Sequence, residues 1–228
     1  MQRYHIVRPL PMPLLSVEKV GEYSEVAIWH CIEPLEWAYE QVPLDKKTKN
    51  EWKQFHPSRQ AELLFMRILM HAAHKTYEVH YEESGKPYIN KPLEISITHS
   101  GQYILIASSS KPIGIDLEGS AEKCAKVYKK FLHQSEQKNF ELGSAKSILW
   151  AWCAKEAIYK GVGKLGVLFN EQILLPTFAY RSIQDYGMAI LETEHQKFNL
   201  FEGVLDKQIW VLAELTEQNE EFSISTNS

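Results

Sequence analysis

Two carboxylates in the segment 114–118 have the spacing of a metal site on a strand. Asp116 and Glu118 are two residues apart in the sequence Gly-Ile-Asp-Leu-Glu. Side chains two apart on a strand face the same side, so these acids point together while Ile115 and Leu117 point into a core. The two charges repel unless a cation lies between them, and Mg²⁺ prefers oxygen ligands. The alternative is a solvated strand face that carries two acids.

A second pair of charges lies on a predicted helix from Ser144 to Lys160. Glu156 and Lys160 are four residues apart, so they lie one above the other on the same helix face. As a surface ion pair they would contribute only about 0.3–0.5 kcal/mol. Trp150 and Trp152 crowd the same helix and indicate burial, which suits a functional site. The spacing alone leaves both interpretations open.

A third segment is an alternating strand, 95–99, that ends in Thr98-His99-Ser100-Gly101. Hydroxyl and imidazole groups at a strand end can bind a phosphate. The alternative is a turn with a hydrogen-bonded structural histidine, and this segment taken alone favours that alternative.

Together and in order, these segments resemble the signature motifs of the 4′-phosphopantetheinyl transferases of the surfactin-synthetase-activating (Sfp-like) type. That family shows a Gly-Lys-Pro turn, a Ser-His segment, a Gly-Ile-Asp-hydrophobic-Glu strand and a Trp-x-x-Lys-Glu-Ala-x-x-Lys helix. The matching segments here are Gly85-Lys86-Pro87, Thr98-His99-Ser100-Gly101, Gly114-Ile115-Asp116-Leu117-Glu118 and Trp152 to Lys160. The likeness is good from Arg59 to Leu175 and loose at both ends.

The resemblance implies an enzyme, a holo-[acyl-carrier-protein] synthase. It would use Mg²⁺ to transfer the 4′-phosphopantetheine arm of coenzyme A to a serine of an apo acyl or peptidyl carrier protein, releasing adenosine 3′,5′-bisphosphate. One alternative is a non-catalytic coenzyme A-binding or carrier-docking protein descended from this family. Another is a different Mg²⁺-dependent phosphoryl-transfer enzyme or hydrolase, which would leave the Gly-Lys-Pro and Thr-His segments unexplained.

The resemblance also implies catalytic and metal-binding residues. Asp116, Glu118 and Glu156 would hold Mg²⁺, and Glu156, or a water that it orders, would take the proton of the carrier serine. Lys160 would offset negative charge that develops on the pyrophosphate. Asp116, Glu156 and Lys160 would thus form the catalytic group.

The implied coenzyme A contacts come from four segments of the chain. They are Arg59 at the 3′-phosphate, Lys86 and Pro87 on the adenine side, Thr98 and His99 at a phosphate, and Lys155 near the nucleotide. Thr98 stands where the family usually has serine. The role of Arg67 stays open, because its family counterpart can be structural.

Apolar periodicity and turn residues predict the elements that position these residues. Residues 58–77 carry an apolar stripe at three- and four-residue spacing, which predicts a long helix that starts at Pro57 and Ser58. Further helices are predicted at 35–41, 121–132 and 144–160, the last ended by Gly161 and Gly163. Strands are predicted at 26–32, 95–99, 103–108, 172–175, 178–181, 187–191, 197–202 and 208–215, and residues 111–118 are predicted to be a turn that enters another strand. The polar tail 216–228 is predicted to fray.

The two halves of the chain echo each other. Phe55-His56-Pro57-Ser58 precedes one long helix, and Phe131-Leu132-His133-Gln134-Ser135 precedes the other. With the resemblance, this echo predicts an α+β fold of two similar pseudo-symmetric lobes, 1–108 and 109–228. Each lobe would be a small antiparallel sheet packed with a long helix, with the ligand cleft between them.

Composition excludes several classes of protein. The 228 residues carry a net charge of −4, without the basic excess typical of nucleic-acid-binding proteins. No apolar run is long enough for a membrane helix or a signal peptide, so a cytoplasmic protein is expected. Chain length favours the single-chain form with two lobes, so a monomer is expected. The histidines His71, His74 and His80 match no zinc spacing. Lysines at 123, 126, 129 and 130 would either face solvent or dock an acidic carrier.

Overall fold

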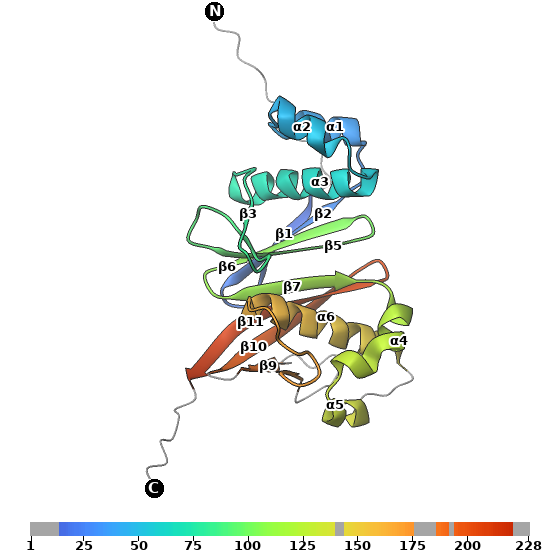
Figure 1. Cartoon of the computed structure of the whole chain (residues 1–228), viewed down its shortest axis with the longest axis vertical. Coiled ribbons are helices and arrows are strands. Elements are labelled where there is room, and N and C mark those ends of the chain that lie inside the picture. Colours follow the sequence, from blue (N-terminus) through green and yellow to red (C-terminus); the bar gives the residue numbers. More distant parts are fainter. Residues whose placement is uncertain (1–13, 140–143, 176–185, 192–193, 221–228) are drawn as a thin grey trace, which may run out of the picture.

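A computed structural model describes residues 14–139, 144–175, 186–191 and 194–220. Within these ranges the chain forms two antiparallel sheets that lie face to face, each covered on its outer face by a long helix (Figure 1). The predicted α+β class with two lobes is therefore confirmed. No helix among the described residues is long and apolar enough to cross a membrane.

The first sheet has the strand order β1-β2-β6-β5-β4-β3. Its strands are β1 (Leu14–Val20), β2 (Ser24–His30), β3 (His80–Tyr81), β4 (Pro87–Tyr88), β5 (Glu94–Ser100) and β6 (Tyr103–Ser109). The helices of this lobe are α1 (Leu35–Gln41), α2 (Lys46–Trp52) and α3 (Pro57–His74). Side chains alternate along β2, so Ala27 and Trp29 pack under α3 while Val26 and Ile28 face the second sheet.

The second sheet has the strand order β7-β11-β10-β9-β8. Its strands are β7 (Ile113–Glu118), β8 (Ile173–Leu174), β9 (Tyr186–Ile190), β10 (Glu194–Leu205) and β11 (Gln208–Glu220). The helices of this lobe are α4 (Ala121–Phe131), α5 (Gln134–Asn139) and α6 (Ala145–Val162). Phe198 and Val211 bury the outer face of the sheet against α6.

A shared apolar core joins the two sheets. Ile113, Ile115 and Leu117 of β7 are all buried against the inner face of the first sheet. The sequence prediction that Ile115 and Leu117 point into a core is thus confirmed. Because these residues face inward, Asp116 between them faces the opposite side, where α6 lies.

The two lobes share one topology. The order β2-β6-β5-β4-β3 in the first sheet corresponds to β7-β11-β10-β9-β8 in the second, and β1 is an addition at the edge. In each lobe the long helix follows the first of these strands. The predicted pseudo-symmetry is therefore present in the order of strands and helices.

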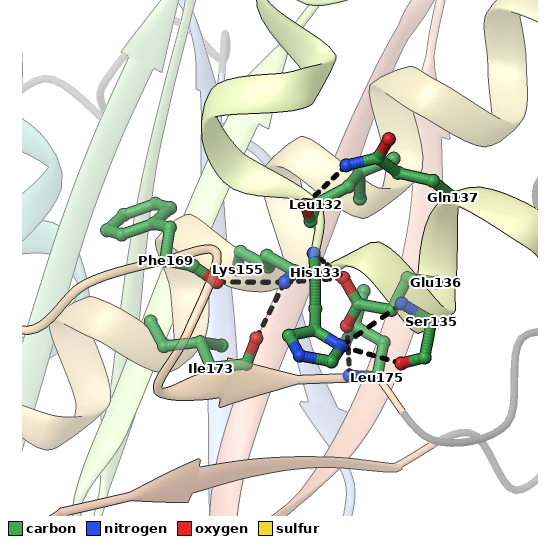
Figure 2. Close-up of polar contacts among 9 residues, drawn as sticks. All are labelled: Leu132, His133, Ser135, Glu136, Gln137, Lys155, Phe169, Ile173 and Leu175. Atoms are coloured by element: carbon green, nitrogen blue, oxygen red, sulfur yellow. Dashed lines mark hydrogen bonds and ion pairs between the residues drawn. The ribbon is translucent and has the colours of Figure 1, made fainter.

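Matching hydrogen bonds occur in the two lobes at the start of the helical segments. A histidine Nδ1 accepts from the amide of the serine two residues later, at 3.3 Å in the first lobe and 3.2 Å in the second. A glutamine four residues after the histidine donates to the carbonyl just before it (Figure 2). These residues are His56, Ser58 and Gln60 in one lobe and His133, Ser135 and Gln137 in the other. The sequence echo thus reflects a repeated local structure.

Several predicted boundaries need correction. Helix α3 ends at His74 rather than at 77, because Lys75 adopts a left-handed conformation with φ of 57°. Gly161 lies inside α6, and Gly163 alone caps that helix in the left-handed conformation. The tail does not fray at 216, because β11 stays paired with β10 as far as Glu220.

Two further predictions are not tested by the structure. The predicted strand 178–181 lies outside the described residues. The proposed division into lobes 1–108 and 109–228 stays a prediction; β6 ends and β7 begins close to that point.

Candidate functional site

Strand β7 and helix α6 touch through their backbones. A Cβ atom added to Gly114 would lie 1.8 Å from the carbonyl oxygen of Ala157, and one added to Gly161 would meet the Phe198 ring at 2.8 Å. Only residues without a side chain allow this approach. The contact brings the acidic strand within side-chain reach of the helix face that carries Glu156 and Lys160.

Asp116 and Lys160 form the central ion pair of the site. The Lys160 Nζ atom lies 2.7 Å from Asp116 Oδ1 and donates a second hydrogen bond to the Ile115 carbonyl at 2.9 Å. Asp116 is only 9% exposed. Asp116 therefore does not lie on a solvated strand face, and Lys160 is paired across the strand–helix junction rather than along the helix surface.

Glu156 carries a carboxyl group whose ionisation is suppressed by its surroundings. Burial raises its pKa to about 7, repulsion from Asp116 adds to that shift, and Lys160 opposes it. Among the described residues, no group hydrogen-bonds to the Glu156 carboxylate. The group can therefore change its protonation state near neutral pH or accept a cation.

Glu118 ends β7 and turns toward the next helix. Its Oε1 atom accepts hydrogen bonds from the amides of Gly119 at 2.7 Å and Ser120 at 2.8 Å. These bonds fix the entry into α4. Within the described part of the chain, no three His, Cys, Asp or Glu side chains form a preassembled metal cluster.

The donor chemistry of the acidic residues nevertheless fits Mg²⁺. All three offer carboxylate oxygens, the ligands that this ion prefers. Asp116 raises the pKa of Glu156, which means that Lys160 does not fully relieve the repulsion between the two carboxylates. A divalent cation held by Asp116, Glu118 and Glu156 would relieve it.

A cavity of about 300 Å³ opens between the two lobes beside this acidic group. It brings together four residues that the motifs predicted: Lys86, Pro87, His99 and Lys160. The rest of its lining comes from Glu62, Tyr81, Ser84, Gly85, Ile95, Ser96, Ile97, Tyr159, Gly163, Lys164 and Leu165. Lys160 both lines the cavity and contacts Asp116, so it connects the cavity to the acidic group.

A neighbouring cavity of about 310 Å³ contains Arg59 and shares Glu62 and His99 with the first. The Glu62 Oε1 atom lies 3.3 Å from His99 Nε2 and also pairs with the Arg59 guanidinium. Sequence reasoning missed Glu62. Its position three residues after Arg59, on the same face of α3, is the signal that could have indicated it.

Thr98 does not line either cavity, in contrast to its predicted phosphate contact. Its side chain is buried, and its hydroxyl hydrogen-bonds to β7. The Thr98 hydroxyl is thus engaged by β7, whereas His99 lines both cavities.

Lys155 is also placed away from the predicted nucleotide contact. It is a fully buried residue of α6, and its Nζ atom lies 2.7 Å from Glu136 Oε2 and donates to the carbonyls of Phe169 and Ile173 (Figure 2). These three interactions use all three hydrogens of the ammonium group. The assignment of Lys155 to the nucleotide is therefore corrected: it holds the second lobe together.

Arg67 has a structural environment as well. Its guanidinium lies 4.5 Å from the centre of the Trp52 ring and donates to the Leu63 carbonyl at 3.1 Å. Burial lowers its pKa. Arg67 lines neither of the two cavities above but a third one, together with His71 and His80.

Comparison with known proteins finds a family model and several relatives that are similar to parts of this chain. Residues 112–185 match the family model of the 4′-phosphopantetheinyl transferase superfamily. The chain is 28% identical over 130 residues to the 4′-phosphopantetheinyl transferase gsp of Aneurinibacillus migulanus, covering 53% of each chain. It is 33% identical over 89 residues to a 4′-phosphopantetheinyl transferase of Bacillus subtilis, covering 36% of this chain and 40% of that protein.

A third relative defines the type more closely. The chain is 29% identical over 116 residues to the 4′-phosphopantetheinyl transferase Sfp of Bacillus subtilis (strain 168), covering 48% of this chain and 49% of Sfp. The chain thus spans about half the length, or less, of the curated relatives it matches. These matches confirm the relationship to the 4′-phosphopantetheinyl transferases. Within them, the chain is similar to the Sfp-like type.

Proposed function

We propose that this protein transfers the 4′-phosphopantetheine arm of coenzyme A to a serine of an apo carrier protein, with Mg²⁺ as cofactor. The observation that carries the proposal is the junction between the lobes. Lys160 lines the cavity and contacts Asp116, and Glu156 lies in the same charged group. The cavity therefore offers a place for a phosphate compound beside a cation, Lys160, that contacts one of the acids proposed to hold the metal.

The chain's own residues have distinct tasks in this reaction. Lys86 and His99 bring positive charge or hydrogen-bond donors to the cavity wall, where they would hold the phosphates of coenzyme A. Arg59 in the adjoining cavity would reach the 3′-phosphate. Lys160 would stabilise negative charge on the pyrophosphate as the bond breaks. When bound by Asp116, Glu118 and Glu156, Mg²⁺ would neutralise charge on the phosphates and make the phosphorus easier to attack.

The transfer step balances with groups on this chain. The carrier serine oxygen forms a bond to the phosphorus that bears the pantetheine arm. The bond from that phosphorus to the bridging oxygen breaks, and adenosine 3′,5′-bisphosphate leaves. Glu156, whose pKa is raised to about 7, or a water that it orders, accepts the serine proton.

Mass spectrometry of apo carrier proteins tests the function directly. With coenzyme A and Mg²⁺, a carrier should gain the mass of one phosphopantetheine group, and a panel of fatty-acid, polyketide and peptide carriers would identify the one served. Coenzyme A binding without transfer to any carrier would favour a non-catalytic binding protein. Turnover of a nucleotide without a carrier would favour a different phosphoryl-transfer enzyme.

The variant Asp116→Ala tests the metal assignment. We expect it to lose transfer activity by a factor of roughly 10² or more, since it removes a metal ligand and the partner of Lys160. Its thermal unfolding should stay cooperative, because the substitution also removes repulsion from Glu156. Glu51→Ala is the matched control, since this exposed acid on α2 lines neither cavity and should keep full activity. Near-normal activity of Asp116→Ala with Mg²⁺ would refute the assignment.

A further inference from the structure

The hydroxyl of Thr98 bridges the two lobes at the acidic strand. Thr98 lies on β5 of the first lobe and is 5% exposed. Its Oγ1 atom accepts a hydrogen bond from the Leu117 amide at 3.1 Å and donates to Asp116 Oδ1 at 3.3 Å. A hydroxyl has one hydrogen to donate, so in this arrangement the donor is committed to Asp116.

The neighbouring hydroxyl of Ser96 forms a parallel contact. Ser96 is two residues before Thr98, on the same side of β5, and its Oγ atom accepts from the Ile115 amide at 3.0 Å. Among the described strands, β7 is at the edge of its sheet and is paired only with β11. The amides on its free edge would otherwise lack partners in a buried position, which is costly. The two hydroxyls therefore fix the position of β7 along the β5 strand of the first lobe.

The two oxygens of Asp116 are used differently. Oδ1 receives Thr98 from the first lobe and Lys160 from α6 of the second. Among the described residues, Oδ2 accepts no hydrogen bond. Two donors that approach from different elements hold the carboxylate plane in one orientation, and Oδ2 remains available to a cation.

We propose that Thr98 is a positioning residue for Asp116, and that it acts on the metal site and not on a phosphate of the substrate. The identity of the cation rests on the proposed function. The orientation of Asp116 and the anchoring of β7 follow from the contacts of Thr98 alone. The threonine methyl group fills the buried junction, and the hydroxyl supplies the hydrogen bonds.

Matched substitutions at position 98 separate these roles. Thr98→Val keeps the shape of the side chain but removes the hydroxyl, whereas Thr98→Ser keeps the hydroxyl and removes the methyl group. Binding of Mn²⁺ alone, measured by the loss of its free electron paramagnetic resonance signal, reports on the site without turnover. We expect Thr98→Val to weaken Mn²⁺ binding by roughly 10- to 100-fold, and Thr98→Ser to restore it.

A second readout tests the anchoring of β7 without a metal. In Thr98→Val the Leu117 amide should exchange its hydrogen with solvent faster than in the wild type, and Thr98→Ser should return it to the slow rate. Ser96→Ala is the matched comparison: it should speed exchange at Ile115, but because Ser96 bonds to the Ile115 amide and not to Asp116, it should weaken Mn²⁺ binding less than Thr98→Val does. If Thr98→Val does not fold, Thr98→Ala replaces it as the variant that lacks the hydroxyl.

The outcomes distinguish this inference from the proposed function. If Thr98→Val binds Mn²⁺ as tightly as the wild type, or loses only its discrimination between coenzyme A and dephospho-coenzyme A, the positioning role is refuted. If the wild type transfers nothing to any carrier while Thr98→Val still weakens Mn²⁺ binding, the proposed function fails and the positioning role stands. If the wild-type protein binds no Mn²⁺, the metal assignment of the proposed function and the action of Thr98 on a metal site are both refuted.

Discussion

At the scale of single residues, the site depends on how the surroundings of each carboxylate set its charge. Asp116 is buried but paired with Lys160 at 2.7 Å. Glu156 has no hydrogen-bonding partner among the described residues, and its pKa is raised to about 7. When no metal is bound, the folded protein therefore keeps the proton of Glu156 to a higher pH than the unfolded chain does. This preference links the stability of the protein to pH.

Stability of the metal-free protein should fall as pH rises through the window set by Glu156. Its pKa is higher in the folded state, about 7, than the ordinary value of 4.5, so the folded state binds the proton more tightly. The resulting stabilisation is complete below pH 4.5 and is lost as pH rises toward 7, by at most about 1.4 kcal/mol per pH unit. Urea unfolding in EDTA across this range measures it.

The control for this effect is Glu156→Gln, which cannot ionise. Its stability should depend less on pH over the same window, and it should exceed that of the wild type above pH 7. Mg²⁺ should stabilise the wild type most at high pH, where the carboxylate is charged. Equal pH dependence in the two proteins would show that Glu156 does not titrate in this range.

The order of residue types along the chain predicted much of the site. The residues that it misassigned have buried side chains that line neither cavity. Lys86, Pro87, His99 and Lys160 line one cavity, as the ordered motifs implied. Lys155 was assigned to the nucleotide, although its position next to Glu156 on a helix argues against that contact. Consecutive residues on a helix point about 100° apart, so Lys155 cannot share the face of its neighbour Glu156. Its partner Glu136 lies on another element, and no local pattern indicates that contact.

At the scale of elements, a buried ion pair ties helix α6 to the rest of its lobe. Glu136 Oε2 accepts from Lys155 and from the His133 amide at 2.7 Å each, while Oε1 accepts from the Leu175 amide at 2.6 Å (Figure 2). The network links α5, α6 and β8 with the loop 163–172. That loop begins with residues that line the cavity.

Breaking this pair on one side should destabilise the protein strongly. Lys155→Met leaves the Glu136 carboxylate buried without a counter-charge, which typically costs about 3–5 kcal/mol. Adding Glu136→Gln removes the charge and should recover a substantial part of the loss, although the carbonyls of Phe169 and Ile173 stay without their donor. Urea unfolding followed by tryptophan fluorescence compares the two variants.

An exposed ion pair gives the reference for this experiment. Lys126 and Glu122 are paired on the surface of α4, so Lys126→Met should change stability by less than about 0.5 kcal/mol. If the double variant at positions 155 and 136 is less stable than Lys155→Met, uncompensated charge is not the cause of the loss. The missing hydrogen bonds would then dominate.

Element boundaries were largely predictable because they depend on local signals. Helix 35–41 and the strands around 95–99 and 103–108 follow from apolar periodicity and turn residues. Gly161 was read as a helix end, since glycine commonly follows helices. Its true role depends on Gly114 and Phe198, which are distant in sequence. Close packing of a strand on a helix leaves no periodic pattern that would identify it.

At the scale of the whole molecule, the lobes are joined by polar contacts as well as by the shared core. Glu214 of β11 is 1% exposed and accepts hydrogen bonds from the amides of Glu22 at 3.2 Å and Tyr23 at 3.0 Å in the turn between β1 and β2. A single acid within an apolar strand gave no sign of this role. The echo between the halves, by contrast, predicted the pseudo-symmetry.

The exposed lysines of α4 give the whole molecule an uneven distribution of charge. Lys123, Lys126, Lys129 and Lys130 are all exposed on one helix, although the net charge of the chain is −4. Under the proposed function, an acidic carrier protein would be drawn toward this helix, which packs against α6. The alternative, a solvated face with no partner, predicts no effect of its charge on transfer.

Reversing the charge of Lys129 and Lys130 decides between these interpretations. The double variant to Glu should lower kcat/KM for the carrier by roughly tenfold at low salt, because steering by opposite charges raises the association rate. The effect should shrink as salt is added, and KM for coenzyme A should not change. Lys46→Glu with Lys47→Glu on α2, at the opposite end of the molecule, makes the same change in net charge (Figure 1). An equal loss in that control would mean that net charge, and not the α4 surface, governs the encounter.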